Sequence, residues 1–313
     1  MVPPKLFPIH RLPFLAIEET FKAMDPIEII NFSVISKRTR TVAKLMNFYS
    51  KYSIHLSVKN STLKVGLYRT NEMVSCIYGI TSNEKKIGKI KEKEKDGCIE
   101  RKVYNYSKNP LEEWKQLCKH VLDIFKKQTI DDLSMQMDAL VDQNVSLIDF
   151  LKANVKSVDE CCLYQLDKKN NVDENFAYLL DNLKINKELC SHLHVKNDNF
   201  DKKIPKSLRE LRIYNSHWIG YEKLMEFVLQ EMDRNGKSFE FKYLELDRRE
   251  LDRFRELVLY DIPHEVVDGG VERNLKIFQN INIEISGGID IRRIDGKTAT
   301  FFLKYSVFMM SVH

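Results

Sequence analysis

The segment from Leu12 to Met46 constrains the fold most strongly, because it encodes three short helices in close succession. Pro13 and Pro26 suit the first position of a helix, where the missing N–H group would have no partner in any case. Asp25 and Ser36 each precede a helical pattern and can cap it, with Glu28 placed to complete a capping box after Asp25. The sequence therefore predicts helices that restart near Asp25 and near Ser36.

These three predicted helices carry more apolar side chains than a segment of this length can bury alone. The apolar residues recur at three- and four-residue steps, so they share one face of each helix; they are Phe14, Ile17, Phe21, Met24, Ile27, Ile30 and Val34. Short chains hide too little of their surface on folding to bury such a face. The apolar face must therefore contact either the rest of the chain or a partner, and the sequence leaves both open.

The order of residues in this segment resembles the F-box motif: Leu12-Pro13, then Ile17, Phe21 and Met24, then Asp25-Pro26, then Ile30, then Ile35-Ser36-Lys37. In that family the helices bind a Skp-type adaptor of a cullin-RING ubiquitin ligase. Two positions depart from the motif, because Leu15 stands where an acidic residue is common and Thr39 where Trp is common. The resemblance implies that eight residues form or support an adaptor-binding surface: Leu12, Pro13, Ile17, Phe21, Met24, Ile27, Ile30 and Ile35.

Composition indicates an ordinary globular protein, with 43% hydrophobic and 30% charged residues. The net charge of +5 comes from 50 basic and 45 acidic residues, a mild excess that does not predict a nucleic-acid partner. The sequence contains no apolar run of membrane-spanning length and no signal-like N-terminus. The six cysteines lack metal-type spacing, which favours reduced thiols and a cytoplasmic or nuclear location.

The chain after the N-terminal helices predicts a mixed structure. Residues 47–105 alternate apolar and polar side chains, which is typical of antiparallel strands. Residues 111–125 form an amphipathic helical pattern, and residues 255–313 again predict strands, with a hairpin at Asp295-Gly296. The expected fold class is α+β, with a small three-helix N-terminus followed by a larger mixed domain.

The middle of the chain shows a degenerate, leucine-rich-repeat-like array of strand and helix patterns. Four segments share an apolar–x–apolar pattern: Cys161-Cys162-Leu163, Leu193-His194-Val195, Leu211-Arg212-Ile213 and Leu244-Glu245-Leu246. Helical patterns over residues 175–183 and 221–229 lie between some of them. Strands that alternate with helices predict a parallel sheet with the helices on its outside.

Side chains alternate along a strand, so the middle residue of each segment is expected on the open face of this sheet. The prediction places Cys162, His194, Arg212 and Glu245 in one row, and Tyr164, Lys196, Tyr214 and Asp247 in the next. A mixed polar and aromatic face suits protein recognition, although a merely solvated face is an equal alternative. The candidate partner-binding residues are His194, Arg212, Tyr214, Glu245 and Asp247.

The wider chain resembles the F-box-associated domain of the large nematode F-box family, through YSKYSIHL, SLRELRIYNSHWIG, YLELD and IEISGGIDIRRIDGKTATFF. The resemblance implies an F-box at residues 1–46 and an F-box-associated domain at residues 47–313 that captures an unidentified protein target. Such a chain is a non-catalytic substrate-recognition subunit that reaches cullin through the adaptor. The alternative is an interaction scaffold without a ligase role, in which the N-terminal helices cap their own core.

Two clusters of residues carry weaker signals for metal or enzyme chemistry. Cys190, His192 and His194 share one strand face and could converge on zinc, but the sequence shows no fourth ligand nearby. The segment from His264 to Asp268 begins like the HExxH motif but lacks the second histidine. We therefore expect no metal, no cofactor and no catalytic site.

Overall fold

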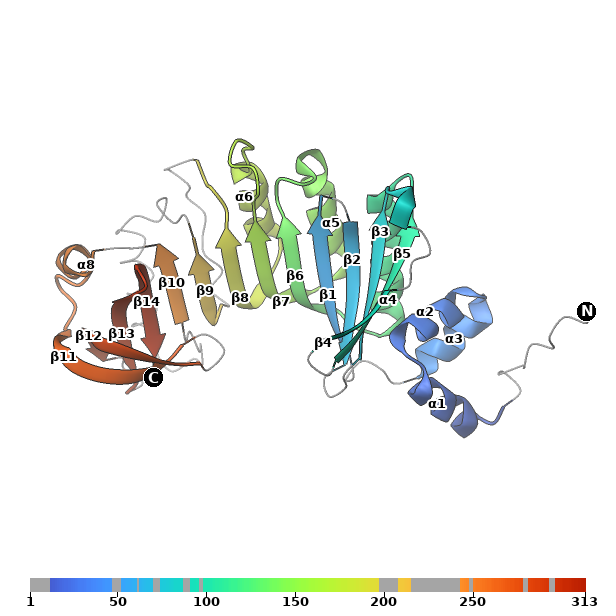
Figure 1. Ribbon diagram of the computed structural model, residues 1–313, viewed down its shortest axis with the longest axis horizontal. Coiled ribbons are helices and arrows are strands. Elements are labelled where there is room, and N and C mark those ends of the chain that lie inside the picture. Colours follow the sequence, from blue (N-terminus) through green and yellow to red (C-terminus); the bar gives the residue numbers. More distant parts are fainter. Residues whose placement is uncertain are drawn as a thin grey trace, which may run out of the picture. The chain divides into compact units, whose positions relative to one another are not determined.

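The protein is described by a computed structural model that covers residues 12–46, 52–60, 62–69, 74–86, 91–95, 98–196, 208–214, 243–247, 250–277, 281–292 and 296–313. The chain divides into two compact units, Met1–Gln128 and Thr129–His313, which we describe separately. The described residues form seven α-helices and 14 strands (Figure 1). The expected α+β fold, with three N-terminal helices before a large mixed sheet domain, is confirmed. None of the described helices combines the length and the apolarity needed to span a membrane.

The second and third N-terminal helices of unit 1 begin after Asp25 and Ser36 as predicted, whereas Pro13 caps the first helix instead of occupying its first position. The three helices are α1 (Phe14–Ala23), α2 (Pro26–Val34) and α3 (Lys37–Leu45). The Asp25 carboxylate accepts a hydrogen bond from the Glu28 N–H, and the Glu28 carboxylate accepts one from the Asp25 N–H. Ser36 caps α3 through the Thr39 N–H in the same reciprocal manner. These caps satisfy N–H groups that a helix N-terminus leaves unpaired.

The strands of unit 1 lie in the order β1-β2-β3-β5-β4. Their bounds are β1 (Tyr52–Lys59), β2 (Thr62–Arg69), β3 (Val74–Thr81), β4 (Lys91–Lys95) and β5 (Cys98–Tyr106). The pairs β1–β2, β2–β3 and β4–β5 are antiparallel, whereas β3 and β5 run parallel. Helix α4 (Pro110–Ile124) packs on β2 and β3, and its Trp114 is fully buried with the indole N–H donating to the Lys64 carbonyl at 3.0 Å.

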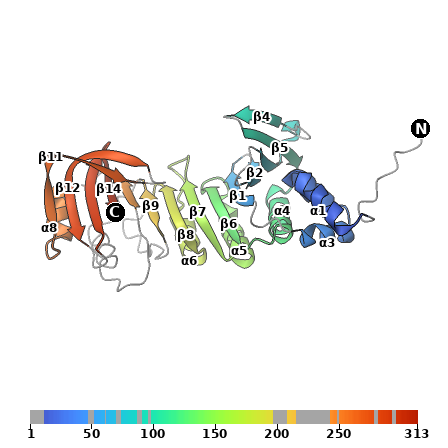
Figure 2. The same ribbon diagram turned by 90° about the horizontal axis from the view of Figure 1, so that it is seen from below.

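Unit 2 contains the predicted parallel array. Strands β6 (Thr129–Gln136), β7 (Ser157–Tyr164), β8 (Ile185–His192), β9 (Glu210–Ile213) and β10 (Tyr243–Asp247) pair in parallel and in chain order. Helices α5 (Asn144–Asn154) and α6 (Asp173–Asn182) connect β6 to β7 and β7 to β8, and Figure 2 shows both on the same face of the sheet. The helix predicted over residues 221–229 lies outside the described residues.

The strand that the sequence predicts at Leu193–Val195 lies earlier in the chain, as β8. Strand β8 ends at His192, and Cys190 rather than His194 lies opposite Cys162. Leu193 and Val195 are buried, so the apolar alternation continues beyond the last strand residue. The strand itself does not continue past His192, because the His194 N–H donates to the Gln165 side chain instead of to a neighbouring strand. The predicted strand position at residues 193–195 was therefore wrong.

The C-terminal part of unit 2 is antiparallel, in the order β11-β12-β13-β14-β10. Its strands are β11 (Glu265–Lys276), β12 (Asn282–Arg292), β13 (Thr298–Lys304) and β14 (Val307–Val312), and β12 pairs with β13 as predicted. Residues expected to begin strands at Leu257–Leu259 instead end helix α8 (Leu251–Val258). Phe254 and Val258, four residues apart, are both buried, whereas Leu257 is half exposed. This spacing of buried residues is that of a helix and not of a strand.

Candidate functional site

Helices α1–α3 concentrate exposed apolar side chains. Five of the fourteen large apolar side chains that are exposed in the described chain lie there, and we call them the exposed apolar set: Phe14 (54% exposed), Leu15 (74%), Val34 (64%), Ile35 (72%) and Leu45 (61%). Scattered exposed apolar residues are normal on a protein surface, but a group of them within residues 14–45 makes this segment the candidate interaction surface. The set belongs to the segment that the sequence marks for adaptor binding.

The eight predicted adaptor-binding residues divide into a core and a surface. Ile17, Phe21, Ile27 and Ile30 are buried, so the predicted contribution of these four residues is limited to supporting a surface from beneath. Leu12 and Met24 are partly buried, and Pro13 and Ile35 are exposed. The rings of Phe21 and Phe32 meet edge to face at 5.3 Å, which fixes α1 against α2.

Sequence reasoning missed four members of the exposed apolar set as surface residues: Phe14, Leu15, Val34 and Leu45. The signal for Leu15 was present, because it stands two residues before Ile17 and therefore on a different face of α1 from the buried residues. Val34 follows the buried period of α2 but is exposed at the last helical position. Its exposure depends on where the helix ends against the rest of unit 1.

The inner side of α2 is anchored to the remainder of unit 1. The Tyr78 hydroxyl on β3 donates to the Ile27 carbonyl at 3.0 Å, and Arg101 on β5 forms an ion pair with Asp25. The Ser33 hydroxyl donates its hydrogen to the Ile30 carbonyl. The Ser33 oxygen can therefore only accept from His120 on α4, whose Nε2 lies 2.7 Å away. Helix α2 thus contacts both the strands and α4 of its own unit.

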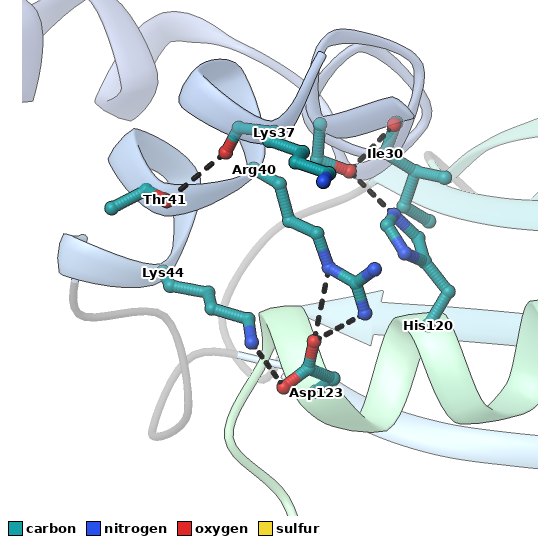
Figure 3. Close-up of polar contacts among 8 residues, drawn as sticks. Ile30, Lys37, Arg40, Thr41, Lys44, His120 and Asp123 are labelled. Atoms are coloured by element: carbon teal, nitrogen blue, oxygen red, sulfur yellow. Dashed lines mark hydrogen bonds and ion pairs between the residues drawn. The ribbon is translucent and has the colours of Figure 1, made fainter. Parts of the chain in front are cut away.

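Helix α3 is anchored to α4 through one carboxylate (Figure 3). Asp123 accepts from Arg40 at 2.6 and 3.1 Å and pairs with Lys44 at 2.6 Å. Burial opposes ionisation of Asp123, but the hydrogen bonds from Lys44 and Arg40 outweigh it and lower the pKa of Asp123. The carboxylate therefore stays ionised and holds α3 in place on α4.

The His120 contact predicts an acid-sensitive junction. Burial, followed by the nearby Arg40 charge, lowers the pKa of His120 below its ordinary value of 6.5. Between these two pKa values His120 binds a proton in the unfolded chain but not in the folded chain. The free energy of unfolding therefore decreases as the pH falls through about 6.5 toward the lower pKa of the folded state. We expect His120→Gln to flatten the pH dependence of thermal unfolding between about pH 7.5 and 5.5.

The control is His192→Gln in unit 2, a second histidine with a lowered pKa, and the two variants are compared at α2–α4 because either one can change the pH dependence of global unfolding. This variant should leave the acid sensitivity of α2–α4, followed by amide hydrogen exchange, unchanged. An unaltered acid response of these helices in His120→Gln would contradict the role assigned to His120.

The open face of the parallel sheet in unit 2 carries a connected polar network. In the observed register Cys162, Cys190, Arg212 and Glu245 form one row across β7–β10. Arg212 pairs with Glu188, and the Tyr214 and Tyr243 hydroxyls donate to Glu245 at 2.7 and 3.0 Å. The His192 ring stacks on Tyr214 with centroids 4.1 Å apart. Burial, together with the bond to Glu245, raises the pKa of Tyr214.

The structure brings together three of the five predicted partner-binding residues: Arg212, Tyr214 and Glu245. Asp247 ends β10 on the same side as Glu245 and is partly buried. His194 lies beyond the end of β8, and Cys190 occupies its predicted place in the row. Lys196 likewise lies beyond β8, and His192 stands opposite Tyr164 instead. Arg212, Tyr214 and Glu245 are half-buried and bonded to other residues of this face, and their role in partner binding stays a prediction.

Comparison with known families identifies the N-terminal segment. The sequence model of the F-box domain family matches residues 9–51, which include all three helices α1–α3. Comparisons with curated proteins and with solved structures found no match. F-box domains generally bind a Skp-family adaptor, and F-box proteins are generally non-catalytic substrate adaptors. The chain therefore contains an F-box domain at residues 9–51, and this supports a role in an SCF-type ubiquitin ligase.

Proposed function

We propose that this protein is the substrate-recognition subunit of a Skp–cullin–F-box ubiquitin ligase. The observation that carries the proposal is the exposed apolar set within the matched F-box residues. Apolar side chains on a surface gain free energy when a partner removes them from water, at about 25 cal/mol per Å². Ile17, Phe21 and Ile30 fill the core of the F-box, so the exposed apolar set is available to contact an adaptor.

The larger part of the chain, residues 47–313, has the role of an F-box-associated domain of the nematode type in this proposal. Its leucine-rich-repeat-like strand and helix array presents the open face with Arg212, Tyr214 and Glu245 to a protein target. The chain itself transfers no ubiquitin, because the other subunits carry out the chemistry and this subunit supplies proximity and orientation. Such a complex operates in the cytoplasm or the nucleus.

A second candidate function is a scaffold whose N-terminal helices cap their own core. The contacts of α2 and α3 with Tyr78, His120 and Asp123 favour this alternative, because they bury the inner side of the helices in unit 1. The two functions use different sides of the same helices. The anchoring contacts account for the inner side of the helices, and the exposed apolar set, which they leave open to solvent, supports the adaptor proposal.

The direct test is binding of the full-length chain to a purified Skp-family adaptor by titration calorimetry. The ligase proposal expects a one-to-one complex with a negative heat-capacity change, the signature of apolar burial. It also expects this complex to recruit cullin in size-exclusion chromatography. The scaffold proposal expects no adaptor binding. Deleting the first 46 residues is a poorer test, because it would uncover the surfaces of α4 and β3 that α2 and α3 now contact.

A further inference from the structure

Two thiols and one imidazole meet on the open face of the unit 2 sheet. Cys162 on β7 and Cys190 on β8 are direct neighbours in the parallel register, and His192 follows two residues later on the same side of β8. One donor atom from each residue lies within 4.8 Å of the other two. We call these three residues the thiol–imidazole cluster.

The spacing of the donor atoms fits a tetrahedral metal ion. Zinc bonds of about 2.3 Å to sulfur and about 2.0 Å to nitrogen place neighbouring ligand atoms roughly 3.4–3.8 Å apart. The Cys190 sulfur and His192 Nε2 lie 3.3 Å apart, close to this separation. All three separations fall within 4.8 Å, so side-chain rotations alone can bring the donor atoms onto one ion. Thiolate and imidazole ligands together suit zinc better than magnesium or calcium.

The surroundings of the cluster match the charge and the orientation that zinc requires. Zn²⁺ with two thiolates is neutral overall, and Arg212, which stands opposite Cys190 on β9, is paired with Glu188. The Tyr214 ring stacked at 10° on His192 restricts the imidazole to an orientation that points Nε2 at Cys190. Cys190 is buried, Cys162 is partly buried and His192 is exposed, so an ion can reach the cluster from the open face.

We propose that Cys162, Cys190 and His192 bind one Zn²⁺ ion, with water in the fourth position. No other His, Cys, Asp or Glu of the described residues joins these three in a metal-sized group. The ion joins β7 to β8 beside Arg212 and Glu245, in the face proposed for target capture. This site differs from the sequence-level candidate, because Cys162 takes the place of His194.

Cobalt substitution tests the proposal on the full-length chain with its thiols kept reduced. Titration with Co²⁺ should give one ion per chain and a thiolate-to-cobalt charge-transfer absorption, and one equivalent of Zn²⁺ should remove that absorption. Cys162→Ser and Cys190→Ser should each weaken this absorption and lower metal affinity at least about tenfold, because loss of even an outer-shell partner typically costs about 10–100-fold. His192→Gln changes only an exposed side chain, so it should keep the fold and the charge-transfer absorption while lowering the affinity.

The matched control is His194→Ala, which removes a nearby imidazole that lies outside the cluster and should leave stoichiometry and absorption unchanged. The proposal is overturned if the unaltered chain shows no charge-transfer absorption with Co²⁺. It is equally overturned if Cys162→Ser and His192→Gln, shown to be folded by circular dichroism, bind Co²⁺ like the unaltered chain. The thiols and imidazole then form a hydrogen-bonded group only.

Discussion

Replacing Leu15 and Ile35 with aspartate in the full-length chain should weaken adaptor binding at least about hundredfold, a loss of about 2.8 kcal/mol. Both side chains are more than 70% exposed, so neither contributes to the core of the F-box. A carboxylate placed in an apolar interface must lose its hydration without gaining a partner, which costs several kcal/mol. Each substitution also removes apolar side-chain area that an adaptor would cover, which is worth about 25 cal/mol per Å². Calorimetric titration with purified adaptor measures the loss.

The control for this double variant is Leu166→Asp, which changes an equally exposed leucine in unit 2 (72% exposed). This substitution has the same chemistry and should leave adaptor affinity unchanged. Thermal unfolding of both variants should stay close to that of the unaltered chain, because surface substitutions usually change stability by less than about 0.5 kcal/mol. Full adaptor binding by the Leu15 and Ile35 double variant would remove the exposed apolar set as the docking surface.

The three F-box helices could be predicted from the sequence because their signals are local. The Asp25–Glu28 and Ser36–Thr39 caps form within one helical turn, and the apolar period of Ile17 and Phe21 is visible in any short window. The division of that apolar face into buried and exposed residues could not be predicted. It depends on Tyr78, His120 and Asp123, which are distant in sequence and adjacent only after folding.

The parallel array shows the same division between local and long-range information. The alternation of apolar residues predicted the strands, but it continues through Leu193 and Val195 and so conceals the end of β8. Register is decided by pairing with β7, and a shift in register changes which side chains become neighbours. For this reason the sequence grouped Cys190 with His194, whereas the fold places Cys190 beside Cys162.

Helix α4 decides whether the F-box is physically separable from the strands that follow it. The sequence places a domain boundary after residue 46, and this boundary stays a prediction. In the structure, α2 and α3 contact α4, and α4 lies within the same compact unit as the F-box helices and β1–β5. The fully buried Trp114 fixes α4 on the sheet through its packing and through the bond to the Lys64 carbonyl.

Trp114→Ala should therefore destabilise unit 1 by about 3–5 kcal/mol, the usual cost of removing a buried aromatic side chain. A loss of this size is a large part of the roughly 5–15 kcal/mol that stabilises a typical domain. We expect a lower denaturant midpoint, loss of hydrogen-exchange protection in α2 and α3 as well as in α4, and weaker adaptor binding. Trp114→Phe keeps most of the ring and loses the N–H donor, so its cost should be about 1–2 kcal/mol.

The pattern of protection in Trp114→Ala distinguishes two organisations of the chain. If α1–α3 lose protection together with α4, the F-box and the strands of unit 1 unfold as one cooperative unit. If α1–α3 keep their protection and adaptor affinity is unchanged, the F-box folds by itself and the boundary after residue 46 is a physical one. In that case the contacts of Arg40 and Lys44 with Asp123 only orient a separately stable docking module.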